Sequence, residues 1–261
     1  MNYEHFLIAL CPNIVVFLMA SVAFYTTIVY AFPQIISKSL NPGIVYFIFF
    51  IAILSFSMFV WCWVYTISSD PGRIADDLHQ RGLLNKIIRG DIPKCLQSFP
   101  VCEKCHVPMP LKSFHCDICH SCHLRYDHHC GVVGQCIADK NTKSFILSFF
   151  YASIYGIIAT FVCFHYAFKL NSHNLLTLDA SEILVFVIGI YCALISICMV
   201  NFVFSMLLSE AVFLSKIHKS ITFSKMLKFF GNNWYTIFIP IQKQASPYAW
   251  PNVFWYDDSE L

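Results

Sequence analysis

The sequence predicts an all-α polytopic membrane protein, in which four transmembrane helices carry a small zinc-bound, cytosolic, cysteine-rich domain between helices 2 and 3. Composition is the first observation: 57% of the residues are hydrophobic and only 12% are charged, whereas soluble domains have about a quarter charged residues. The second is a set of four apolar runs that reach the roughly 20 residues needed to cross the hydrocarbon core. The third is a polar stretch between the second and third runs, where cysteine and histidine cluster.

The four apolar runs cover residues 6–32, 43–67, 144–168 and 182–208. The first contains Pro12 near its start. An apolar run near an N-terminus can also be a cleaved signal peptide, but this one is too long and lacks a basic n-region and a clear small-residue cleavage site. We therefore expect it to be a retained helix.

These runs divide the chain into four regions. We expect transmembrane helices 1 and 2 in residues 1–67, the cysteine-rich domain in residues 68–143, helices 3 and 4 in residues 144–214, and a cytosolic tail in residues 215–261. Early in the second region, apolar residues at 83–84 and 87–88 predict a short helix lying at the membrane surface.

Lysine and arginine indicate the orientation. Ten of the 17 lie between runs two and three, five lie in the C-terminal tail, and each short connector holds one. By the positive-inside rule, the cysteine-rich domain and both termini face the cytosol. A reducing compartment also suits 13 cysteines clustered beside histidines, since such thiols bind metal instead of forming disulfides. The net charge of +2 gives no reason to expect a nucleic-acid partner.

Seven of the thirteen cysteines lie between residues 102 and 136, with histidines interleaved. Two thiolates separated by two residues can face one tetrahedral ion, so this spacing predicts structural zinc. Two tetrahedral sites need eight ligands, and eight residues here make two Cys3His sites. These residues are Cys102, Cys105, His115, Cys116, Cys119, Cys122, His129 and Cys136. We expect His106, His120 and His123 at the surface, with His120 as the substitute ligand if the partition differs.

This count leaves Cys130 and His128 free and almost adjacent. Successive side chains of an extended segment point to opposite sides. His129 can therefore face a metal while its two neighbours, His128 and Cys130, face a common cleft. A thiol beside an imidazole is the minimal activated nucleophile. Asp127 can hold the imidazole tautomer if a turn brings it close. The alternative is a purely structural zinc module, with seven cysteines and one histidine as ligands and no chemistry.

The order of these residues resembles the cysteine-rich domain of the DHHC family of protein S-acyltransferases. The matching pattern begins at Cys102 and ends at Phe145, and it reads C-x2-C-x9-H-C-x2-C-x2-C-x4-D-H-H-C-x5-C-x4-N-x3-F. Its asparagine is Asn141, and its Asp-His-His-Cys tetrapeptide is residues 127–130. The Asp-Pro-Gly at residues 70–72 predicts a helix stop after the second run and also matches a DPG motif of the family.

The resemblance implies the role of each site residue. It implies that Cys130 accepts the acyl group, with His128 as its base and Asp127 as the residue that orients the base. It implies one zinc ion at Cys102, Cys105, His115 and Cys122, and a second at Cys116, Cys119, His129 and Cys136.

The resemblance also implies the activity of a protein S-palmitoyltransferase. Such an enzyme takes a long-chain acyl group from acyl-CoA (palmitoyl-CoA), holds it on its cysteine, and passes it to cysteines of membrane-associated proteins. The expected cofactors are two structural Zn2+ ions, and the expected partners are acyl-CoA, those protein substrates and the lipid bilayer. We expect an endomembrane location, in the Golgi apparatus or the endoplasmic reticulum.

Departures from the family pattern keep a second function open. The family usually has Pro-Trp after the nucleophile, where this chain has Gly131-Val132, and Gln135 and Ala138 replace residues that are commonly Asn and Gly. Ser224 stands where a T-T-x-E motif would place Glu. The alternative function is therefore a catalytically weak or inactive, zinc-stabilised membrane adaptor. A four-span transporter fits less well, because ionisable residues are nearly absent near the span centres.

Overall fold

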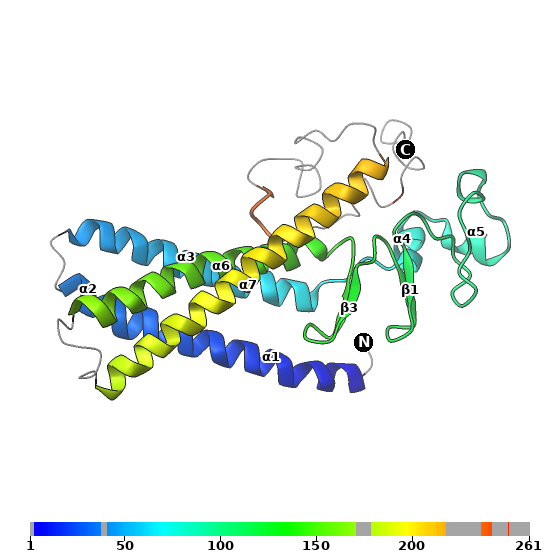
Figure 1. Cartoon of the computed structure of the whole chain (residues 1–261). Coiled ribbons are helices and arrows are strands. Elements are labelled where there is room, and N and C mark those ends of the chain that lie inside the picture. Colours follow the sequence, from blue (N-terminus) through cyan, green and yellow to red (C-terminus); the bar gives the residue numbers. More distant parts are fainter. Residues whose placement is uncertain (1–2, 38–40, 171–178, 218–235, 242–249, 251–261) are drawn as a thin grey trace. The chain divides into compact units, whose positions relative to one another are not determined.

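The computed structural model describes residues 3–37, 41–170, 179–217, 236–241 and 250 (Figure 1). The chain divides into two compact units. The first, which we call the cysteine-rich unit, comprises residues 1–12, 63–145 and 210–261. The second, which we call the helical unit, comprises residues 13–62 and 146–209.

Four helices among the described residues are long and apolar enough to cross a membrane, which confirms the predicted fold class. The candidate spans are Leu10–Ser37, Pro42–Ser68, Thr142–Phe168 and Ala180–Phe213. They are built from α1 (Tyr3–Phe24) with α2 (Phe32–Ser37), α3 (Pro42–Ser68), α6 (Thr142–His165) and α7 (Ala180–Ile217) (Figure 1). Large apolar side chains are exposed along these helices, among them Phe47 and Phe204, as expected of helices that meet lipid.

The first span changes its helical pitch part-way along. A π-helical segment, Tyr25–Ala31, joins α1 to α2, and Pro33 is the second residue of α2. Proline has no N–H to donate, and its ring displaces the carbonyl four residues earlier. A π-segment accommodates such a defect without ending the helix.

Side chains from α1, α3, α6 and α7 form the buried core of the helical unit. The Tyr155 hydroxyl donates to the Ala23 carbonyl at 3.1 Å, which ties α6 to α1. A Cβ added at Gly156 would lie 2.2 Å from Ser196 Oγ, so glycine is what lets α6 and α7 approach this closely.

The cysteine-rich unit contains two short antiparallel hairpins, which lie in sequence between α3 and α6, where the cysteine-rich segment was predicted. Strand β1 (Phe114–Cys116) pairs with β2 (Ser121–His123), and β3 (His128–Cys130) pairs with β4 (Gln135–Ile137) (Figure 1). Two-stranded hairpins are only marginally stable alone. They therefore depend on side-chain anchors, which include metal-type clusters and a small apolar core.

The predicted short helix forms as α5 (Leu84–Ile88). It follows α4 (Ile74–Gln80) and precedes a 3-10 turn, Lys94–Leu96. Ile87 is buried in the apolar core of the unit and Leu83 packs against the same core, whereas Ile88 is 72% exposed. The location of this helix at the membrane surface stays a prediction.

The Asp-Pro-Gly turn after α3 does more than stop the helix. The carbonyls of Pro71 and Gly72 accept hydrogen bonds from the N–H groups of Lys140 (3.1 Å) and Leu124 (2.9 Å). Gly72 has a φ of 101°, a conformation that favours glycine. A Cβ there would also lie 3.4 Å from the Lys140 side chain. The turn is thus a docking point for the loop that precedes α6.

A buried network of charges joins the end of α7 to the rest of the cysteine-rich unit. Arg125 is 2% exposed and donates to Asp139 Oδ1 at 3.1 Å and to the carboxylate of Glu210. Lys112 Nζ donates to the other oxygen of Glu210 at 2.7 Å. Both cations lie over the ring of Phe213, at 5.2 and 5.3 Å from its centroid. Glu210 therefore compensates two cations at once.

We expect Glu210→Gln to lower the free energy of unfolding of this unit by about 3 kcal/mol, since removing one partner leaves buried charge uncompensated. The measurement is the temperature midpoint of zinc release from the purified protein. Asp91→Asn is the matched control, because Asp91 is exposed and the chemical change is the same. Equal midpoints in the two variants would contradict the stabilising role of the network.

Candidate functional site

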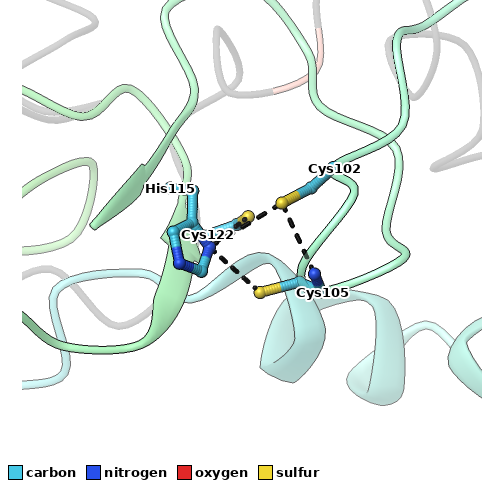
Figure 2. A group of neighbouring side chains, drawn as sticks. All are labelled: Cys102, Cys105, His115 and Cys122. Atoms are coloured by element: carbon cyan, nitrogen blue, oxygen red, sulfur yellow. Dashed lines mark hydrogen bonds between the residues drawn. The ribbon is translucent and has the colours of Figure 1, made fainter. Parts of the chain in front are cut away.

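The first metal-type cluster contains Cys102, Cys105, His115 and Cys122 (Figure 2). His115 Nδ1 lies 3.7, 3.2 and 3.6 Å from the three sulfurs, in that chain order. Zinc held tetrahedrally at about 2.3 Å from sulfur and about 2.0 Å from nitrogen would place these atoms about 3.6 Å apart. The donor set and its spacing therefore fit a structural zinc ion.

The second cluster has the same composition, with Cys116, Cys119, His129 and Cys136. His129 Nδ1 lies 3.7, 3.4 and 3.7 Å from the three sulfurs. All ligand atoms of each cluster lie within 4.8 Å of one another. The structure therefore brings the eight predicted ligands together in two sets of four, with the division that the family resemblance implies.

Each cluster is assembled from one C-x2-C turn and one hairpin. In both turns the N–H of the second cysteine donates to the sulfur of the first at 3.4 Å. The hairpins supply cross-strand pairs, because His115 lies opposite Cys122 and His129 lies opposite Cys136. The neighbours His115 and Cys116 belong to different clusters, since adjacent strand residues point to opposite faces.

A carboxylate outside the ligand set orients one of the ligands. His115 Nε2 lies 3.4 Å from Asp117 Oδ1, so this nitrogen can donate its proton while Nδ1 faces the sulfurs. Such hydrogen bonds fix the tautomer of metal-binding histidines. Lys104 in turn pairs with Asp117.

The histidines outside the ligand sets do not all lie at the surface. His106 and His120 are exposed, each with positive φ directly after a C-x2-C turn, so the prediction holds for these two. It is wrong for His123, which is fully buried in β2 with Nε2 3.0 Å from Ser121 Oγ. Both Cys122 and His123 are buried in β2, and an isolated bridge to Arg73 covers the end of the strand at His123.

Three residues outside both metal-type clusters lie together on or beside β3. Asp127 Oδ2 lies 3.0 Å from His128 Nδ1, and His128 and Cys130 are the two ends of the three-residue strand. The turn that this arrangement requires occurs at Arg125, which has a φ of 46°. Because β3 is extended, His128 and Cys130 share one face of the strand while His129 points to the metal-type cluster.

The environment favours an ion pair between the thiol and the imidazole. Burial of Cys130 acts to raise its pKa, but hydrogen bonds from His128 and from the N–H groups of Val133 and Val132 outweigh it, and the pKa of the thiol is lowered. Hydrogen bonds from His128 to Asp127 and to Cys130 raise the pKa of the imidazole to about 9. Both pKa shifts favour a thiolate paired with an imidazolium.

The pH dependence of alkylation tests this pairing. Because the pKa of Cys130 is lowered, its thiolate is lost only when the pH falls through that lowered value. The imidazolium is lost when the pH rises through about 9. We expect His128→Ala to move the alkylation midpoint of Cys130 upward, toward the value of about 8.5 for a free thiol, and to slow alkylation at pH 7 by about tenfold. Iodoacetamide labelling followed by peptide mass spectrometry provides the measurement.

A matched control is His79→Ala, which removes an exposed histidine from α4. It should leave the midpoint at the wild-type value. An unchanged midpoint in His128→Ala would exclude the ion pair.

Comparisons with known proteins agree with this geometry. The family model described as DHHC palmitoyltransferase matches residues 97–228, just over half of the chain. The chain belongs to the DHHC palmitoyltransferase family.

Individual relatives of this DHHC-family chain match over shorter parts. It is 34% identical over 104 residues to the probable protein S-acyltransferase 15 of Arabidopsis thaliana, with 38% of each chain covered. It is 27% identical over 142 residues to the palmitoyltransferase ZDHHC2 of Homo sapiens, covering 47% of this chain and 39% of the relative. It is 26% identical over 200 residues to the palmitoyltransferase akr1 of Schizosaccharomyces pombe, covering 62% of this chain and 30% of the relative. These matches thus span two fifths or less of the relatives' own lengths.

The departures of this DHHC-family chain have different structural settings. Nothing lies within 4 Å of a Cβ placed at Gly131, and Val132 is 38% exposed, so larger residues fit there. Ala138 is fully buried, and its carbonyl accepts the Thr142 hydroxyl at 2.6 Å. Gln135 contacts the end of α3. The Ser224 departure lies outside the described residues.

Two motif residues gain a physical role that the sequence pattern did not reveal. Asn141 accepts the Ala138 N–H at 2.8 Å and donates to the Cys136 carbonyl at 2.9 Å, which fixes a cluster cysteine to the start of α6. Phe145 is 3% exposed, and its ring lies 5.8 Å from the His128 ring. Only their recurrence in the family pattern marked these residues in the sequence.

Proposed function

We propose that the protein is a protein S-palmitoyltransferase, which moves a long-chain acyl group from acyl-CoA through an acyl-enzyme on Cys130 to cysteines of membrane-associated proteins. The observation that carries the proposal is the pairing of Asp127 Oδ2 with His128 Nδ1 at 3.0 Å, beside the strand that also holds Cys130. It lies outside two clusters that already have four ligands each. The thiol is therefore available for chemistry, and family membership names the reaction class.

In the first half-reaction, the Cys130 thiolate attacks the thioester carbonyl of acyl-CoA. A carbon–sulfur bond forms to Cys130, and collapse of the tetrahedral intermediate breaks the bond to the sulfur of CoA. The imidazolium of His128 gives its proton to the departing thiolate. Asp127 keeps the ring oriented and stabilises its charged form.

In the second half-reaction, His128 takes the proton of an incoming protein thiol. The resulting thiolate attacks the acyl group on Cys130, and the Cys130 thiolate leaves. His128 keeps the proton that it took, so the imidazolium and the Cys130 thiolate are both restored. Each half-reaction uses the same base, so the kinetics should be of the ping-pong type.

We further propose that the eight cluster residues hold two structural zinc ions. Zinc would supply folding energy to the short hairpins and take no part in acyl transfer. His129 and Cys136, on β3 and β4, would be fixed by the second ion. The hairpin that carries Cys130 is then rigid on its metal side.

Purified protein incubated with labelled palmitoyl-CoA tests the function. We expect a hydroxylamine-sensitive label on Cys130, and loss of that label when a lipid-anchored peptide with a cysteine beside its anchor is added. The peptide should gain what the enzyme loses. A protein that keeps both zinc ions and takes no label from any acyl-chain length would instead be a membrane adaptor.

We also propose that the cysteine-rich domain and both termini face the cytosol of an endomembrane, either Golgi or endoplasmic reticulum. Positive charge concentrates in the segment between α3 and α6 and in the C-terminal tail, which supports this orientation. Protease protection in sealed microsomes is the measurement. Protection of residues 68–143 from protease added outside the microsomes would place them in the lumen and contradict the orientation.

A further inference from the structure

The hairpin that bears Cys130 has two faces with different surroundings. His129 lies opposite Cys136, and both belong to the second metal-type cluster. Cys130 lies opposite Gln135 in the same ladder. Since side chains of adjacent strand residues point to opposite faces, Gln135 shares its face with the nucleophile. The cluster therefore anchors one face of the hairpin, and something else must anchor the other.

Gln135 supplies that second anchor at the end of α3. Its Nε2 lies 2.5 Å from the carbonyl oxygen of Thr66 and 3.1 Å from those of Ile67 and Ser69. The last carbonyls of a helix have no partner within the helix, so a side-chain amide there acts as a cap. Carbonyl groups that lie 66 to 69 residues earlier in the chain are thus bonded to Gln135, the residue opposite Cys130.

We propose that Gln135 is a positioning residue, which sets the place of the Cys130 sulfur relative to the end of α3. This inference rests on the proposed function, in which that sulfur is the nucleophile. The last turns of α3, from residue 63 on, belong to the same compact unit as the hairpin, so the end of the helix is a fixed reference for it.

The chemistry of the contact suggests the substitution that tests it. Gln135→Glu keeps the size of the side chain but removes both N–H donors. Its carboxylate would face carbonyl oxygens at a helix C-terminus, where negative charge is unfavourable. Gln97→Glu is the matched control, because Gln97 Nε2 also donates to a backbone carbonyl, that of Ile92 at 2.9 Å, on the exposed surface.

We expect Gln135→Glu to lower kcat for acylation of Cys130 by palmitoyl-CoA about 10- to 100-fold with little change in KM, since small misplacements of a reacting group have effects of this size. The zinc content should stay at the wild-type level. Gln135→Asn keeps the donors and should recover part of the rate. Gln97→Glu should match wild type.

Two results would overturn the proposal. One is wild-type kcat in Gln135→Glu. The other is a loss of activity accompanied by zinc loss, which would mean a structural role only. Hydrogen exchange without acyl-CoA separates this inference from the proposed function: the Ser69 N–H, bonded to the Tyr65 carbonyl at 2.9 Å, should lose protection in Gln135→Glu alone. Lost protection with no label on wild-type Cys130 would retain the anchor and reject the acyltransferase.

Discussion

Cys130→Ser should abolish the acyl label, lowering the acylation rate by more than about a thousandfold, while the protein still holds both zinc ions. The hydroxyl of serine is far less acidic than a thiol, so His128 cannot hold it as an anion at neutral pH. The zinc content should not change, because two clusters of four ligands are complete without this sulfur. Label incorporation and metal analysis on the same preparation give both values.

Cys95→Ser provides the matched control for that experiment. Cys95 is exposed and lies in the cysteine-rich unit, outside both clusters. The control should keep the wild-type label and the wild-type metal content. Loss of one zinc ion in Cys130→Ser would show that this cysteine is a ligand, and the nucleophile would then have to be sought elsewhere.

The adjacent histidines should separate folding from chemistry. His129→Ala should lose one zinc ion and destabilise the cysteine-rich unit strongly, since structural zinc supplies about 10–16 kcal/mol in zinc-finger peptides. His128→Ala should keep both ions and the fold but lose acylation, because the base is removed. Metal content and thermal unfolding distinguish the two, and acylation completes the comparison.

This pair of variants is its own control, because both make the same substitution at neighbouring residues of β3. Alternation along the strand is what assigns His129 to the cluster and His128 to Cys130. If both variants lost zinc equally, the two side chains would share one environment. The assignment of faces would then be wrong.

Properties that depend on neighbouring residues could be predicted without the structure. Hydropathy over about 20 residues is sufficient to identify a span, so all four spans were predicted. The eight residues of the two metal-type clusters were also predicted, because a C-x2-C pair can face one ion from a single turn. The His128–Cys130 pair followed from alternation in an extended segment, and the structure has a strand there.

Properties that depend on contacts distant in the chain required the tertiary structure. The eight-ligand count alone does not say which four share an ion. Adjacent residues such as His115 and Cys116 serve different clusters because a β-strand turns them to opposite faces. The buried position of His123, which a surface prediction from polarity missed, also required the structure, in which an isolated bridge pairs it with Arg73.

The sequence by itself therefore determined a four-span, cysteine-rich membrane protein with a thiol and an imidazole left over from its ligand count, since hydropathy and ligand spacing are local properties. The tertiary structure alone decided what holds that pair in place. Gln135 reaches a carbonyl 69 residues earlier in the chain, and Arg125 pairs with a carboxylate 85 residues later. No local pattern encodes such contacts, because they form only when folding brings the end of α3 and the end of α7 to the cysteine-rich segment.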